Sequence, residues 1–177
     1  MKQRLRSVLI VSSLALLAAG VSRAQPAPAA NPLDVVPDKM PFDIPYGAPV
    51  TLDRAEVVLA ASLAEAKTRG WKLVCAVIDS GGNLVSLKRM DGAQLASIDI
   101  AMHKARAAVK FRRETKVFET NVQTGNVYQL TLDDVVASRG GIPLVSEGKL
   151  VGAIGCSGGS GSQDEVVAKA GVAAFNK

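Results

Sequence analysis

Hydrophobic positions recur with helical spacing in three stretches of the chain. The first covers residues 51–70, where Thr51 can cap a helix, Asp53 lies in the first turn and a glycine can end it. The other two cover residues 97–111 and 163–175. In each stretch apolar residues lie three and four positions apart, which predicts an amphipathic helix with one buried face.

Two pairs of short apolar runs predict β-hairpins. Residues 71–79 are apolar on both faces, and the turn sequence at 80–83 leads into an alternating run at 84–89. A second pair, 142–145 and 150–156, surrounds a polar turn that contains glycine. Because hairpins join neighbouring antiparallel strands, the sheet is predicted to be at least partly antiparallel.

The segment 115–130 is weakly patterned and predicts a short helix followed by a strand near 127–130. The order is therefore helix, hairpin, helix, hairpin, helix. This order predicts an α+β fold: a single domain over 51–177, with a central antiparallel sheet of two hairpins plus that weaker strand, and helices packed on it.

The first 24 residues predict a cleavable signal peptide. Three basic residues precede an apolar run at 8–19, and Ser22 and Ala24 suit the two positions that a signal peptidase reads. The run is shorter than the roughly 20 residues of a membrane-spanning helix. We therefore expect cleavage after Ala24, a periplasmic or secreted protein, and no membrane span after cleavage.

Cleavage would remove most of the positive charge. The chain has a formal net charge of +5, and four of its 21 basic residues but none of its 16 acidic residues lie before residue 25, which leaves +1. A protein that binds nucleic acid through its charge keeps a basic patch in its folded part. The composition therefore predicts no nucleic-acid partner.

Residues 25–50 hold seven of the eight prolines and predict an extended arm or spacer. The arm could be a leader without structure or could wrap a neighbouring subunit. Met40, Phe42, Ile44 and Tyr46 alternate with polar or proline positions, which favours order in its second half.

Cys75 and Cys156, the only cysteines, both lie in apolar runs. Buried free thiols are the simpler interpretation, but export would permit one disulfide, and the sequence alone cannot bring the two residues together.

Two regions carry candidate chemistry. In the first, the loop Ser157-Gly158-Gly159 leaves a strand and enters a helix, so that its N–H groups could bind an anion, or it could be a turn needed for packing. Its G-x-S-x-G spelling does not predict a serine hydrolase, because the only histidine, His103, comes before the serine. Arg89 and Asp91, at the end of a predicted strand, could bind a polar group or form a charged surface turn.

The second region is the helix at 97–111, which carries His103, Lys104, Arg106 and Lys110. A single histidine beside a core face is more often a surface residue than a ligand, and a zinc site would need more ligands. Asp164 and Glu165, in contrast, begin the last helix, where the helix dipole alone accounts for acidic residues.

Five motifs in order resemble the GlcG/HbpS family, the haem-binding-protein-like domain also found at the C-terminus of PduO-type proteins. The resemblance covers about residues 51–176. Its motifs are Ala76-Val77-Ile78-Asp79-Ser80-Gly81-Gly82, Arg89-Met90-Asp91-Gly92-Ala93, Lys104-Ala105, Gly140-Gly141-Ile142-Pro143 and the run 151–159 followed by Asp164-Glu165.

The resemblance implies an α+β domain that forms homo-oligomers and binds haem or a related tetrapyrrole for storage, sensing or slow degradation. His103 would then be the haem-iron ligand, and Lys104, Arg106 and Lys110 would pair with the propionates. Many relatives have threonine where this chain has Ala107, which removes one possible ligand from this helix.

Two other interpretations stay open. In one, the protein is an enzyme or accessory protein that acts on a small oxygenated carboxylate of glycolate-type metabolism, bound by Arg89, Asp91, Ser157, Gly158 and Gly159. In the other, it is a structural oligomer whose motifs serve only the fold. The residues that surround the main pocket would discriminate between a haem site and a carboxylate site.

Overall fold

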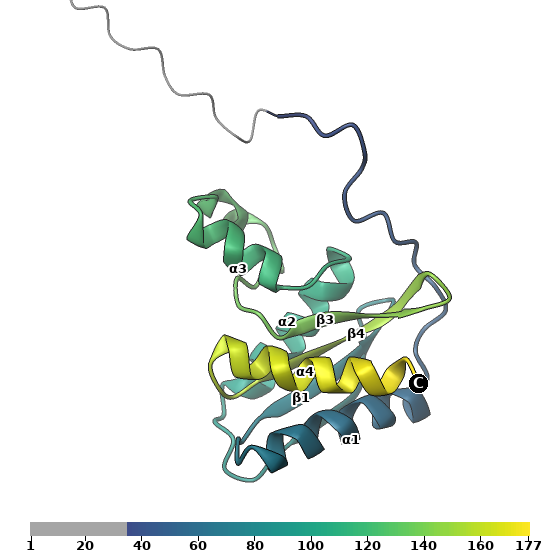
Figure 1. Cartoon of the computed structure of the whole chain (residues 1–177), viewed down its shortest axis with the longest axis vertical. Helices are drawn as coiled ribbons and strands as arrows, with labels where there is room; N and C mark the ends of the chain where they lie inside the picture. The colour runs from purple at the N-terminus through teal and green to yellow at the C-terminus, as the bar shows by residue number, and fades with distance from the viewer. Residues whose placement is uncertain (1–34) are drawn as a thin grey trace, which may run out of the picture. The chain divides into compact units, whose positions relative to one another are not determined.

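The computed structural model describes residues 35–177, so the predicted signal peptide and the first part of the arm lie outside the described residues. Lys39–Lys177 form one compact unit (Figure 1). No helix within 35–177 combines the length and apolar character needed to cross a membrane. The elements are α1 (Leu52–Thr68), β1 (Val74–Asp79), β2 (Leu84–Arg89), α2 (Ser97–Lys110), α3 (Lys116–Gln123), η2 (Val127–Thr131), β3 (Gly141–Ser146), β4 (Lys149–Ser157) and α4 (Gly161–Phe175).

The four strands form one antiparallel sheet in the order β2-β1-β4-β3. Both predicted hairpins are therefore confirmed, and they join through the central pair β1 and β4. The Thr51 side chain caps α1 by accepting a hydrogen bond from the Arg54 N–H, as the sequence predicts.

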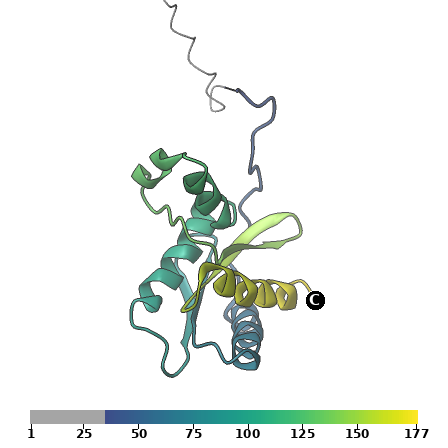
Figure 2. The ribbon, with the colours of Figure 1, turned by 60° about the vertical axis from the view of Figure 1, so that its left-hand side comes forward.

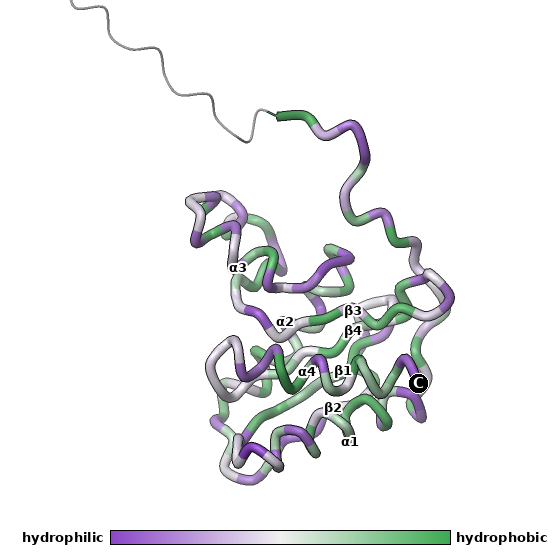
Figure 3. Tube along the Cα trace, viewed as in Figure 1, coloured by the Kyte–Doolittle hydropathy of each residue, from purple (hydrophilic) through white to green (hydrophobic). Residues whose placement is uncertain are grey.

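Helices cover both faces of the sheet (Figures 1 and 2). Helices α1 and α4 pack together over one face, where the core includes Leu59, Val77 and Ile154. Helix α2 covers the other face, against Ala76 and Ala153. Hydrophobic residues recur along α1 and the strands in Figure 3, as expected for elements that share a core.

Helix α2 lies unusually close to the sheet because two paired glycines face it. Gly141 and Gly155 are opposite each other on β3 and β4. A Cβ added at Gly155 would lie 2.1 Å from the carbonyl oxygen of Ala101, and one at Gly141 would lie 2.3 Å from that of Lys104. These glycines allow the close approach that sets the position of α2.

One predicted element is wrong. The segment near 127–130 is not a strand but the 3-10 helix η2. It lies beside α3, away from any sheet edge, and its backbone donors are satisfied locally, as in the hydrogen bond from the Leu132 N–H to the Gln129 carbonyl at 3.2 Å. The apolar residues that suggested a strand, such as Val127 and Leu130, are exposed.

The end of the arm pairs with the sheet, a contact that the alternation at 40–46 did not predict. The Gly47 N–H donates to the Leu150 carbonyl, and the Leu150 N–H donates to the Pro45 carbonyl, each at 2.8 Å. Strand β1 pairs with β4 only as far as Asp79, and past that residue the arm pairs with β4 instead. The Tyr46 hydroxyl also donates to the Val109 carbonyl at 3.1 Å, which ties the arm to α2.

The two cysteines form a disulfide, so the simpler interpretation of free thiols is wrong. Cys75 and Cys156 are directly opposite each other on β1 and β4, with Cα atoms 4.2 Å apart. Long-range strand register brought them together, which is why sequence spacing could not decide the question.

Candidate functional site

Lys104 is the centre of the most deeply buried polar cluster. Its side chain is 1% exposed because it lies on the face of α2 that also carries Ala101 and Ala108. The Lys104 Nζ lies 2.7 Å from Oδ2 of Asp164 and donates to the Cys156 carbonyl at 3.3 Å. The structure therefore places Lys104 away from the surface on which a propionate partner was expected.

The glycine-rich loop binds the same carboxylate. The Gly159 N–H donates to Oδ1 of Asp164 at 3.0 Å, and Gly140, at φ +116°, leaves room for the Asp164 side chain. Burial raises the pKa of Asp164, while Lys104 and the N–H groups of Gly158 and Gly159 oppose that rise. Helix-dipole stabilisation alone is thus the wrong explanation of Asp164.

The predicted carboxylate site does not assemble as expected. Arg89 and Ser157 both pair with Val74, so they lie at the same end of the sheet. However, the Ser157 side chain is buried and donates to the Ser97 hydroxyl at 3.3 Å, whereas Arg89 and Asp91 point to solvent. The Gly159 N–H of the glycine-rich loop already donates to the Asp164 carboxylate, so an external carboxylate cannot bind to the same N–H group.

The outer face of α2 brings three of the predicted haem contacts together. His103 is 52% exposed, and its Nε2 lies 3.9 Å from Oδ1 of Asp134. Lys110 donates a hydrogen bond to Oδ2 of the same carboxylate. That hydrogen bond is the main reason that the pKa of Asp134 is low, and the nearby charges of His103 and Arg106 lower it further.

Sequence reasoning missed Asp134, which comes from the connection between η2 and β3. Its backbone has φ +66°, which an aspartate tolerates better than most residues. Exposed apolar side chains border this surface. Ile100 lies one turn before His103 on α2, and Leu132 comes two residues before Asp134.

A second missed cluster links α3 to α4. Arg139 donates to Glu119 from Nε and from its backbone N–H, each at 2.8 Å, and its Nη1 lies 3.3 Å from Glu165. Glu165 also accepts hydrogen bonds from Lys116 at 3.3 Å and Lys169 at 2.5 Å. Glu165 is therefore an ion-pair centre, a role that the helix dipole alone does not describe.

This cluster predicts a pH dependence. The side-chain hydrogen bond from Arg139 is the main cause that lowers the pKa of Glu119. The ionised carboxylate therefore stabilises the fold above the ordinary glutamate pKa of about 4.3. This stabilisation is lost as the pH falls through the lowered pKa of Glu119 in the folded protein. At neutral pH, Glu119→Gln should cost roughly 1 kcal/mol. Between about pH 6 and about pH 3, urea denaturation should show a steeper loss of stability in the wild type than in Glu119→Gln. Parallel pH profiles would contradict this role.

Known proteins resemble this chain in fold and in sequence. A family model described as haem degrading protein HbpS-like matches residues 50–173. Protein GlcG of Escherichia coli (strain K12) is 40% identical over 103 residues, which cover 58% of this chain and 77% of GlcG. The crystal structure of Klebsiella pneumoniae ORFY is 29% identical with a TM-score of 0.69, covering 80% of this chain and 97% of that one. The PduOC:heme complex is 28% identical with a TM-score of 0.66, covering 72% and 95%. The chain therefore belongs to the HbpS-like family.

Proposed function

We propose that this protein binds haem or a related tetrapyrrole on the outer face of α2, with His103 as the iron ligand. The observation that carries the proposal is the accessible imidazole: His103 is 52% exposed, and its nearest acidic oxygen, on Asp134, is 3.9 Å away. At that distance the ring nitrogen is not engaged in a strong hydrogen bond. An imidazole of this kind is a common axial ligand of haem iron.

The surrounding residues fit such a ligand. Arg106 and Lys110 lie on the same side of α2 as His103 and offer cations for the propionates. Lys104 cannot pair with a propionate because it is buried against Asp164. Ile100 offers apolar surface for the ring. Haem in the related PduOC complex and the haem-degrading description of the family support the same ligand class.

We further propose that the protein acts as a homo-oligomer. Haem has two flat faces, and the outer side of one helix can cover only one of them. Apolar side chains of η2 and of the residue after it are exposed and would suit a second subunit: Val127, Tyr128, Leu130 and Leu132.

Export to the periplasm or to the exterior is supported by the Cys75–Cys156 disulfide, since disulfides persist mainly in oxidising compartments. In that setting the protein would store or sense haem, or degrade it slowly.

A haem titration followed by absorption spectroscopy tests the ligand assignment. The wild type should give a saturable Soret shift, and His103→Ala should weaken binding at least about tenfold and alter the spectrum, because the axial ligand is lost. Asp134→Asn should strengthen binding, because it removes a negative charge near the propionates and frees Lys110.

Lys88→Gln is a matched control, since Lys88 is an exposed cation on β2 that pairs with Glu56. It should leave the titration unchanged. A Soret shift that survives in His103→Ala would retain haem but remove His103 as the ligand. The absence of saturable binding in the wild type would reject the haem proposal.

A further inference from the structure

A second feature of the domain is a groove of about 680 Å³ on a different surface. The arm, the α2–α3 connection, α3, β3 and the end of α4 form it, and its lining includes neither His103 nor Asp134. Its apolar wall consists of Ile142, Pro143, Val145 and Val172. The volume is within the range of sites that bind small molecules.

One side of this groove carries an arginine without an acidic partner. The Arg113 guanidinium lies 3.6 Å from the centre of the Phe42 ring, and its Nε donates to the Phe111 carbonyl at 2.9 Å. Among residues 35–177, no carboxylate oxygen lies within 4.0 Å of its nitrogens. Burial, and then the charge of Arg112, lower the pKa of Arg113, and the negative charge of a bound anion would oppose this lowering.

The lining of the groove holds three cations, Arg112, Arg113 and Lys116, and one carboxylate, Glu114. Arg112 lies 3.8 Å from the exposed Asp43, a long contact in solvent, and Lys116 lies 3.3 Å from Glu165. Glu114 also lines the groove, and its charge acts on Lys169 of α4. Arg113 is thus the cation that is available to a ligand.

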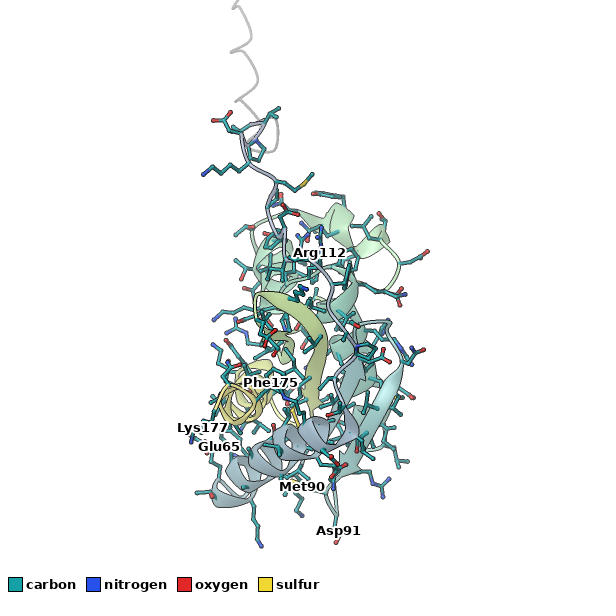
Figure 4. All side chains as sticks on the ribbon, turned by 90° about the vertical axis from the view of Figure 1, so that its right-hand side faces the viewer. Glu65, Met90, Asp91, Arg112, Phe175 and Lys177 are labelled. Carbon is teal, nitrogen blue, oxygen red and sulfur yellow. A yellow bond between two sulfur atoms is a disulfide. The ribbon has the colours of Figure 1, made fainter. Side chains whose placement is uncertain are left out.

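Backbone strain occurs at two residues of the same groove. Phe42 has φ +61° and Arg112 has φ +54°, a conformation that is costly for side chains of this size. Arg112 also donates to the Ile44 carbonyl at 3.3 Å, which holds the arm beside the groove (Figure 4). The strained Phe42 contacts Arg113, and the strained Arg112 directly precedes Arg113 in the chain. Backbone strain of this kind clusters at active sites, ligand clamps and switch regions.

We infer that this groove binds a medium-chain alkyl carboxylate, with the carboxylate paired to Arg113 and the chain lying along Ile142, Val145 and Val172. The site combines an apolar wall with one unpartnered cation, and this combination matches an amphipathic anion. A neutral alkyl chain would leave Arg113 without a partner, and a short carboxylate would leave the wall uncovered. The inference is independent of haem binding at His103.

Isothermal titration of the purified protein with decanoate tests the inference. Saturable binding is expected at one site per chain, and each CH2 group removed from the ligand should weaken it up to about fourfold. Decanol, which has the same chain without the charge, should bind at least about tenfold more weakly. Arg113→Gln should weaken decanoate binding by about 10- to 100-fold, and Arg113→Lys should restore part of the loss.

Two variants serve as controls, and a third gives a second probe of the groove. Arg69→Gln removes an arginine that also lies over an aromatic ring, that of Trp71, but directly after the end of α1 and outside the groove, and it should bind decanoate normally. His103→Ala should also bind normally, which separates this inference from the haem proposal. Phe42→Ala, at a residue of the arm, should weaken binding several-fold and gives a second probe if Arg113→Gln does not fold.

Four results would overturn the inference. They are the absence of saturable decanoate binding, equal binding of decanol, unchanged binding in both Arg113→Gln and Phe42→Ala, and displacement of decanoate by equimolar haem. In the last case the groove would be the haem site. Sedimentation in which Arg113→Gln separates subunits, without any decanoate binding to the wild type, would instead identify the groove as an interface between copies.

Discussion

Replacement of Lys104 by methionine is expected to lower the free energy of unfolding by about 3–5 kcal/mol at neutral pH. Methionine is similar in size, so the main change is that Asp164, 3% exposed, loses its cation and keeps only N–H partners from the glycine loop. An unpaired buried charge is costly, whereas the intact pair is nearly balanced by its desolvation. Urea denaturation measures the loss.

The pH dependence of this variant provides a sharper test. Burial already raises the pKa of Asp164, and removal of Lys104, which opposes that rise, should raise it further. A carboxyl group whose pKa is raised in the folded state binds more protons in that state than in the unfolded chain. The free energy of unfolding therefore increases as the pH falls from the raised pKa toward the ordinary aspartate pKa of about 3.9. Lys104→Met should therefore recover stability relative to the wild type on acidification.

The double variant Lys104→Met/Asp164→Leu is the matched control, because it removes both charges. It should regain most of the stability that the single variant loses, and it should lack the recovery at low pH. A double variant as unstable as Lys104→Met would contradict the ion-pair explanation and would indicate that packing around Lys104 is the cause.

Loss of the Cys75–Cys156 disulfide is expected to cost about 2–5 kcal/mol. The bridge closes a loop across a sequence separation of 81 residues and joins the two central strands, so its removal gives the unfolded chain much more freedom. Urea denaturation with and without dithiothreitol should show a lower midpoint in the reduced wild type. The variant Cys75→Ala/Cys156→Ala should have a low midpoint in both conditions, and identical midpoints for oxidised and reduced wild type would contradict the prediction.

The central position of this bridge links stability to the candidate sites. Cys156 supplies the carbonyl that accepts a hydrogen bond from Lys104, and Lys104 lies on α2, the helix that also carries His103 on its outer side. Loss of the disulfide should therefore weaken the proposed haem binding only where it unfolds the protein, since His103 faces away from the sheet.

Local patterns in the sequence determined the regular elements well. The predicted helix at 97–111 is Ser97–Lys110, and the predicted strand at 84–89 is Leu84–Arg89. These predictions succeed because side-chain periodicity follows from backbone geometry within a few residues. The strand near 127–130 failed because an apolar run forms a strand only where a sheet edge is available to pair with it, and this run lies beside α3.

Lys104 shows what the sequence could not predict, which is the partner of a buried charge. It lies three positions from Ala101 and four from Ala108, which is the spacing of the buried face of α2, but a lysine is rarely buried without a partner, and the family resemblance assigned it to the propionates. The partner, Asp164, is 60 positions away in the sequence. Asp134 beside His103 and Phe42 beside Arg113 are also contacts between residues that are distant in the sequence.

The sequence by itself thus determined the order of the main helices and the two antiparallel hairpins, the family and a histidine on the second predicted helix. Only the tertiary structure decided that the cysteines pair, that Lys104 is internal, that the glycine loop holds Asp164 and that a groove forms under Arg113. The physical reason is that periodicity is a property of neighbouring residues, whereas ion pairs, disulfides and grooves depend on strand register and helix packing between residues distant in the chain.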